Sequence, residues 1–185
     1  VARGNSFSSI INVRNSYDIF SDKLLVLMDG RTLYNSQSSG TYWSSKDSFF
    51  PDVDQIEIVR GPGAAVWGSN AVEGVINIRT RGAEETPGGY LSSMVSTEEG
   101  YTLAARHGGR FGEDLFFRVY GKYREVGSFD PLPKTLKTGE PYPGEESMWH
   151  SQAGFRLDYL PEDSIRWSLD GGYYDGEERY YAEGI

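Results

Sequence analysis

Two histidines and four Glu-Glu pairs are the side chains of this sequence best suited to acid–base or metal chemistry. His107 and His150 lie on different predicted strands, and neither belongs to a spacing such as H-E-x-x-H, so we expect both to be structural. The glutamate pairs fall in predicted turns and loops, where solvation is favoured over binding of a divalent cation. These pairs are Glu84–Glu85, Glu98–Glu99, Glu145–Glu146 and Glu177–Glu178. Without a nucleophile beside a base, the sequence predicts no catalytic residue, no metal site, no cofactor and no enzyme.

The glycine-rich stretch Gly61-Pro-Gly-Ala-Ala-Val-Trp-Gly68 could be taken for a phosphate-binding loop. It has neither the G-x-G-x-x-G spacing nor the Gly-Lys-Ser/Thr ending of such loops. Nucleic acid is also disfavoured as a partner, because the formal net charge is −9 and binding to phosphates requires a basic surface. Cysteine is absent, which excludes disulfides and thiolate metal sites.

The composition favours a mainly β protein with many turns, since 13 tyrosines and 23 glycines occur among 185 residues. In the first half the strand-like runs are short. Residues 23–28 form an apolar run that ends at an Asp-Gly turn, and residues 56–60 and 75–80 are further runs. Residues 64–67 can form one helical turn. These elements predict a small mixed α/β domain.

From Gly88 the pattern changes to longer runs in which apolar and polar residues alternate. The runs are 88–96, 101–110, 115–125, 148–159 and 165–174, and the first two alternate less cleanly. In the clearest run the odd-numbered residues, from Trp149 to Tyr159, are mostly apolar, whereas the even-numbered ones are mostly polar. Alternation of this kind is typical of a soluble β-sandwich as well as of a membrane barrel.

Two features favour the barrel. Trp149 and Tyr159 share the apolar face of one run, and at ~3.3 Å per residue and a tilt of ~40° they lie ~25 Å apart along the axis, the height of a barrel's apolar band. The connections 111–114 and 160–164 are short and 126–147 is long, as periplasmic turns and extracellular loops are. A soluble β-sandwich that binds a ligand is the alternative.

Three stretches of the first half resemble the plug domain of TonB-dependent receptors. Residues 24–31 are similar to the family's LVLIDGR, residues 56–63 to IEVIRGPG and residues 67–80 to WGANAVNGVINIIT, in the same order and at the same spacing. Arg3-Gly4 resembles an upstream Arg-Gly pair of the family. The resemblance implies a plug domain over residues 1–82, truncated at its N-terminus.

In such receptors a barrel of about 22 strands follows the plug, so residues 83–185 are expected to hold its first five or so strands. The expected fold is mainly β: a small mixed α/β plug followed by antiparallel strands of an incomplete transmembrane β-barrel. The segment that contacts TonB, the TonB box, is not in the sequence. We therefore expect a fragment cut at both ends, whose function belongs to its parent protein.

The resemblance also implies roles for single residues. Arg60 resembles a residue that pairs with glutamates of the barrel wall, and Glu57 and Arg3 are the further candidates for plug–barrel ion pairing. Simple solvation of Arg60 and capping of a strand edge by Glu57 are the alternatives. The glycines of the motifs are expected to serve backbone geometry, because glycine takes positive φ without steric cost. They are Gly30, Gly61, Gly63, Gly68 and Gly74.

Ligand contacts are expected from a plug loop in which Tyr34, Asn35, Tyr42 and Trp43 combine aromatic and polar side chains. Packing of these aromatics on the plug or the barrel wall is the alternative. The implied function is active uptake of a bulky nutrient across the bacterial outer membrane, within outer-membrane lipid and driven by TonB and its inner-membrane energising complex. A ferric siderophore or another iron complex is the expected cargo, and cobalamin, haem and glycans are the alternatives.

Overall fold

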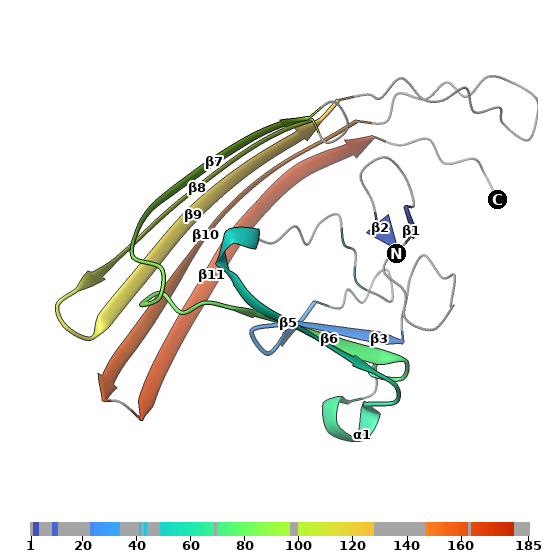
Figure 1. Ribbon diagram of the computed structural model, residues 1–185, viewed down its shortest axis with the longest axis horizontal. Coiled ribbons are helices and arrows are strands. Elements are labelled where there is room, and N and C mark those ends of the chain that lie inside the picture. The colour runs from blue at the N-terminus through green and yellow to red at the C-terminus, as the bar shows by residue number, and fades with distance from the viewer. Residues whose placement is uncertain are drawn as a thin grey trace, which may run out of the picture. The chain divides into compact units, whose positions relative to one another are not determined.

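The computed structural model describes residues 2–3, 9–10, 23–33, 41, 43, 49–68, 70–96, 100–127, 147–162 and 164–179. The chain forms two compact units, which we call unit 1 and unit 2, and it passes from unit 1 to unit 2 between Gly82 and Ala83. Each unit is built on β-sheet (Figure 1), so the predicted mainly β fold is confirmed. Within the part of the chain that the structure describes, no helix is long and apolar enough to cross a membrane.

Unit 1 contains a mixed four-stranded sheet in the order β4-β3-β6-β5 and a separate pair, β1-β2. Its elements are β1 (Ala2–Arg3), β2 (Ser9–Ile10), β3 (Leu24–Met28), β4 (Arg31–Thr32), the 3₁₀ helix η2 (Phe50–Asp52), β5 (Val53–Arg60), α1 (Ala64–Trp67) and β6 (Gly74–Thr80). Strands β3 and β6 are parallel, whereas β4 and β5 run antiparallel to their neighbours. The small mixed sheet with one short helix is as predicted.

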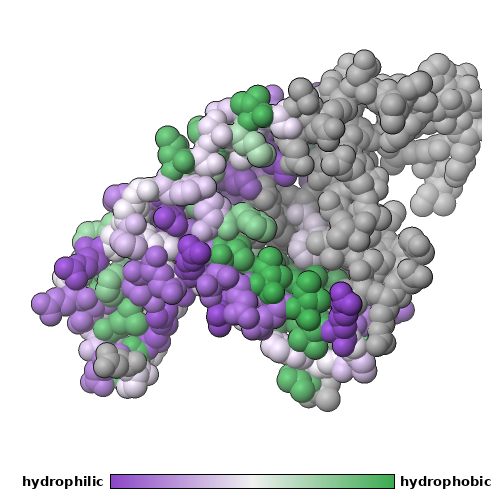
Figure 2. All heavy atoms as spheres, viewed as in Figure 1, coloured by the Kyte–Doolittle hydropathy of each residue, from purple (hydrophilic) through white to green (hydrophobic). Residues whose placement is uncertain are grey.

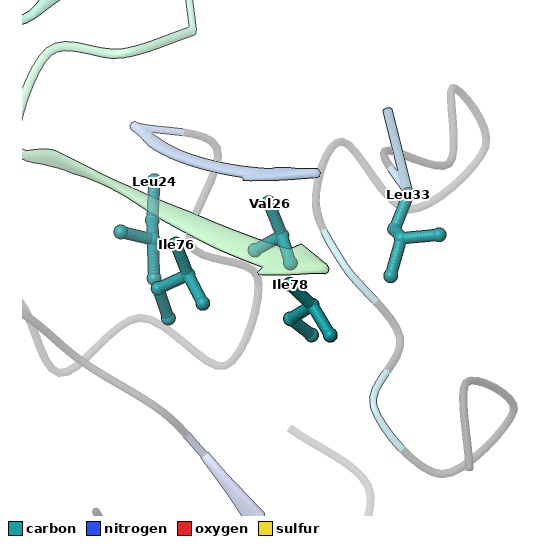
Figure 3. Packing of buried hydrophobic residues seen from close by; sticks show 5 residues of the cluster. All are labelled: Leu24, Val26, Leu33, Ile76 and Ile78. Atoms are coloured by element: carbon teal, nitrogen blue, oxygen red, sulfur yellow. The ribbon is translucent and has the colours of Figure 1, made fainter. Parts of the chain in front are cut away.

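The two central strands of unit 1, β3 and β6, are buried on both faces. One face carries a cluster of Leu24, Val26, Leu33, Ile76 and Ile78 (Figure 3). Leu25 and Val75, whose side chains point to the opposite face, form a second cluster with Ala71. Burial on both faces explains why β3 is a continuous apolar run in the sequence rather than an alternating one.

The turn between β3 and β4 consists of Asp29 and Gly30. Their φ angles are 48° and 80°, the positive values that a two-residue type I′ hairpin requires at both positions. The Asp29 carboxylate also accepts two hydrogen bonds from Thr80 at the end of β6, 2.8 Å from the backbone nitrogen and 2.7 Å from Oγ1. The turn therefore fixes the hairpin to the end of the central strand.

Unit 2 is a curved antiparallel sheet in which each strand pairs with the next along the chain (Figure 1). Its strands are β7 (Gly88–Ser96), β8 (Gly100–Phe111), β9 (Leu115–Val126), β10 (Ser147–Glu162) and β11 (Ile165–Arg179). All five predicted runs are strands, and the residues between β8 and β9 form the predicted short turn. The predicted long connection 126–147 lies mostly outside the described residues.

The last two strands are longer than predicted. β10 continues through Leu160, Pro161 and Glu162, which the sequence analysis placed in a turn, and β11 continues to Arg179 rather than ending at residue 174. The register of β10 against β11 shifts between Tyr159 and Glu162. Such an irregularity tolerates a proline, which has no N–H to give to the ladder, so the strand is not ended by Pro161.

Candidate functional site

One face of the unit 2 sheet is an exposed apolar surface. Because of the way the strands pair, their odd-numbered residues share this face. Phe155 of β10, for example, lies between Val119 of β9 and Gly171 of β11. We call this surface the apolar face. Large side chains on it are well exposed: Leu91 75%, Val95 79%, Phe111 63%, Trp167 69%, Leu169 60% and Tyr173 69%. Hydrophobic residues accordingly reach the molecular surface between hydrophilic ones (Figure 2).

The even-numbered residues of the same strands form the opposite face, which we call the polar face. Several of its charged or polar side chains are buried, with Arg118 4%, His150 0% and Asp158 0% exposed. A half-buried sheet in water shows the reverse pattern, with its apolar side chains inside and its charged ones outside. An exposed apolar face backed by a buried polar face is the arrangement of a strand between lipid and a polar interior.

The apolar face changes to a charged surface at one end. Near the short turns, Tyr159 lies between Leu115 and Trp167, which are also large and apolar. Ten residues along β10, Trp149 instead lies between Glu125 and Glu177. An aromatic side chain with an apolar body and a polar N–H suits such an apolar–polar boundary. Trp149 and Tyr159 therefore mark the two ends of the apolar region of β10.

Of the four residues predicted to contact a ligand, the structure describes only Trp43. Its side chain is half-buried and packs against the unit 1 cluster that contains Leu24 and Val26. This contact corresponds to the alternative interpretation, packing on the plug. Tyr34, Asn35 and Tyr42 lie outside the described residues, so their role stays a prediction.

The residues predicted for plug–barrel ion pairing are not brought together within unit 1. Glu57 in β5 accepts hydrogen bonds from Gln55 Nε2 at 2.9 Å and from Asn77 Nδ2 at 3.1 Å. Arg60 is the exposed last residue of β5, and its side chain has no ion-pair partner among the described residues. Arg3 lies in β1, where its backbone is paired with Ser9. The pairing of these side chains with a barrel wall remains a prediction.

The motif glycines differ in their backbone conformation. Gly30, Gly61 and Gly68 have positive φ, at 80°, 113° and 99°. Gly63 and Gly74 are not among the residues with positive φ, and at Gly63 the reason for glycine is space. A Cβ built there would lie 3.2 Å from the Trp67 ring and 3.4 Å from a methyl group of Val75.

The two histidines lie apart, on different faces of unit 2. His150 is fully buried on the polar face, with its ring centroid 5.4 Å from that of Tyr174. His107 is exposed on the apolar face, 6.1 Å from the ring of Phe117. Among the residues that the structure describes, no group of three His, Cys, Asp or Glu side chains could hold a metal ion.

Two of the predicted glutamate pairs, Glu98–Glu99 and Glu145–Glu146, lie outside the described residues, and the other two differ from the expectation of solvated loops. Glu177 and Glu178 lie within β11, and Glu177 pairs with Arg179 at 2.9 Å. Glu84 is partly buried and pairs with Arg166. Asp158 was not among the predicted site residues, because in the sequence it is one of several polar residues of a strand. Its contacts depend on residues far away in the sequence, and no local pattern marks them.

Comparison with known proteins finds relatives of the whole chain. A family model described as the TonB-dependent Receptor Plug Domain matches residues 1–75. The chain is 29% identical over 189 residues to the vitamin B12 transporter BtuB of Vibrio vulnificus, covering 99% of the chain and 29% of that protein. It is 30% identical over 179 residues to the ferric enterobactin receptor PirA of Pseudomonas aeruginosa, covering 84% of the chain and 24% of that protein.

A solved structure shows the same fold. The crystal structure of a ferric enterobactin receptor of Pseudomonas aeruginosa, PfeA, in complex with enterobactin aligns with a TM-score of 0.56 and 23% identity. The alignment covers 85% of the chain and 26% of that receptor. The chain thus spans between 24% and 29% of the length of the two curated relatives.

Proposed function

Because the chain belongs to the TonB-dependent receptor family, we propose that it forms the plug and the first wall strands of a transporter in the bacterial outer membrane. In this proposal residues 1–82 are the plug domain, and residues 83–185 hold the first five strands of the barrel. The match of the plug model to residues 1–75 and the change of unit after Gly82 support this division.

The observation that carries the proposal is the reversed burial of the unit 2 sheet. Its apolar face is exposed from Leu91 in β7 to Leu169 in β11, while Asp158 and His150 on the polar face are buried. Exposed apolar side chains on long antiparallel strands are stable against lipid hydrocarbon but costly against water. The polar face then belongs to the lumen, where a plug can be held by hydrogen bonds and ion pairs.

The proposed activity is active uptake of a scarce, bulky nutrient. The ligand binds to the plug through Tyr34, Asn35, Tyr42 and Trp43, of which Trp43 also packs on the plug core, and to extracellular loops. Arg3, Glu57 and Arg60 hold the plug to the wall through ion pairs. TonB, with its inner-membrane energising complex, pulls on the plug and opens a path. No covalent bond is made or broken, so the protein is not an enzyme.

For the cargo we propose a ferric siderophore or another iron complex. Of the relatives compared above, two are named for ferric enterobactin and one for vitamin B12. Cobalamin is therefore the first alternative, followed by haem and glycans. All of these ligands are bulky, and aromatic side chains on a polar loop can stack on or surround a bulky ligand.

The first experiment measures the abundance of the full-length protein in outer-membrane fractions of iron-starved and iron-replete cells. Strong induction on starvation is expected for an iron-complex transporter. The second step is uptake of radiolabelled iron from a panel of ferric siderophores, in cells with the protein, without it and without TonB. An iron-independent protein that takes up labelled cobalamin would redirect the proposal to that cargo, and absence from the outer-membrane fraction would overturn the transporter itself.

A pair of variants tests the ligand site once a cargo is found. Tyr42→Ala is expected to weaken ligand binding at least tenfold, because it removes an aromatic surface from the proposed site. Trp167→Ala is the matched control, since Trp167 is an aromatic residue on the apolar face of β11 and is expected to face lipid. Equal binding by the two variants would exclude Tyr42 from the site.

A further inference from the structure

The linker that joins unit 1 to unit 2 is very short. The backbone N–H of Arg81 donates to the carbonyl oxygen of Asp52 at 2.9 Å, which holds it in unit 1. The backbone N–H of Ala83 donates to Oδ2 of Asp158 in β10 at 2.7 Å, which holds it in unit 2. Only Gly82 lies between these two anchored residues. Motion of unit 1 cannot be absorbed by a flexible linker unless one of the anchors is released.

Asp158 is the centre of the second anchor. Its side chain is fully buried, and its Oδ2 accepts a further hydrogen bond from Arg156 Nε at 2.8 Å. Oδ1 accepts one from Ser168 Oγ of β11 at 2.5 Å. A buried carboxylate is stable only when its charge is paired and its oxygens are hydrogen-bonded. The three donors meet that requirement, and one of them is the backbone of the linker itself.

Two more contacts hold the residues that follow Ala83. Glu84 forms an ion pair with Arg166 at the start of β11. The backbone of Thr86, which is 2% exposed, lies directly against Gly108 of β8, where a Cβ would come within 2.1 Å of the Thr86 carbonyl oxygen. Only glycine permits so close an approach. Residues 83–86 are thus held by side chains or backbone of β8, β10 and β11.

We propose that residues 83–86 form a clamp, which we call the linker clamp, that stays on the wall strands when the plug moves. Asp158 is its positioning residue, because it binds the first backbone group of the clamp and organises Arg156 and Ser168 around it. The presence of the clamp is a property of unit 2, whereas its use as a stop for plug motion rests on the proposed transport function. With the clamp closed, Gly82 is the last residue of the chain that can move with the plug.

Hydrogen exchange of the full-length protein, read by mass spectrometry in low urea, tests the clamp directly. In the unsubstituted protein, amides of unit 1 are expected to exchange faster as urea is added, while those of residues 83–86 stay protected. In Asp158→Ala the exchange of residues 83–86 is expected to rise at least tenfold and to follow that of unit 1. Asp170→Ala is the matched control, because Asp170 is an exposed acid of the polar face in the row of Arg156.

Unchanged exchange of residues 83–86 in Asp158→Ala, or an equal rise in Asp170→Ala, would overturn the clamp. If Asp158→Ala does not assemble in the membrane, Arg166→Gln replaces it, since it removes the partner of Glu84 from an exposed position. The expected rise is then about threefold, and no rise would again overturn the proposal. Uptake is measured in parallel. If the clamp responds as expected but the protein transports no nutrient, the proposed function is refuted and the clamp is not.

Discussion

A charged residue in the middle of the apolar face should strongly destabilise the protein if that face meets lipid. Val119 in β9 is 46% exposed and lies in the row of Phe155, between the boundary residues Trp149 and Tyr159. An arginine near the bilayer midplane of a barrel costs about 2–4 kcal/mol, which is about a 30- to 900-fold change in the folding equilibrium. On a face exposed to water the same change stays within about 0.5 kcal/mol. Val119→Arg therefore separates a barrel wall from a soluble sheet.

The assay is urea denaturation of the full-length protein in lipid bilayers, followed by tryptophan fluorescence. Ser151→Arg is the control, because Ser151 shares the apolar face but lies in a row with Asp175, next to the charged end of β10. Near the interface the expected cost falls to about 0–1 kcal/mol. A Val119→Arg protein as stable as the unsubstituted one, or an equal loss in both variants, would refute the assignment of this face to lipid.

Three further substitutions test local packing through the same denaturation assay. Gly108→Ala should cost at least about 2 kcal/mol of folding free energy, because its Cβ would lie 2.1 Å from the carbonyl oxygen of Thr86. Gly121→Ala is the control and should cost less than about 1 kcal/mol, because the nearest atom to its Cβ lies at 3.8 Å. Similar losses in the two variants would contradict the close approach at Gly108. Gly30→Ala should destabilise the protein by about 1 kcal/mol, because the φ of Gly30 is 80°. Gly89→Ala is the control and should be neutral or stabilising, because Gly89 has open space around it and no positive φ. A larger loss of stability in Gly89→Ala than in Gly30→Ala would contradict the turn geometry. Ile76→Ala should cost about 2–4 kcal/mol since Ile76 is 5% exposed in the unit 1 cluster, and a loss below about 1 kcal/mol would contradict that burial.

The strands of unit 2 and their faces could be predicted because a strand repeats every two residues. Alternation assigned the odd-numbered residues of β10 to one face, and the register of β9 and β11 extends that face across the sheet. The ends of the strands could not be predicted in the same way. Pro161 suggested a turn, but a shift of register next to it leaves the residue in the strand. The last residues of β11 are polar on both faces, so alternation of hydropathy ends before the strand does.

In unit 1 local chemistry was sufficient where a turn or a short run decides the structure. The Asp29-Gly30 pair adopts the turn that its residue types favour, and the apolar run of β3 is the central strand. Hydropathy could not reveal which strands are neighbours. β3 is parallel to β6, about fifty residues later in the chain, and only the packing of both apolar faces brings the two together.

Asp158 shows why the anchoring residues of unit 2 were missed. In the sequence it is one of several polar residues at even-numbered positions of β10, and nothing local distinguishes it from Asp170. Its role depends on the backbone N–H of Ala83, which is 75 residues away. Glu84 was likewise expected to be solvated because it lies in a turn. Its ion pair depends on the position of Arg166 at the start of β11.

The two units differ in the contacts that stabilise them, and this difference bears on how a plug could move. Unit 1 buries aliphatic clusters around Val26 and Val75, whose contacts are shared among many atoms and are lost together when the cluster opens. Unit 2 exposes its apolar face and buries Asp158, whose carboxylate is stabilised by hydrogen bonds from Arg156, Ser168 and the backbone of Ala83, each worth about 1.5–3 kcal/mol. Such bonds are directional and can be broken one at a time. The bonds that hold the linker clamp within unit 2 can therefore be released in steps, while the aliphatic core of unit 1 stays intact.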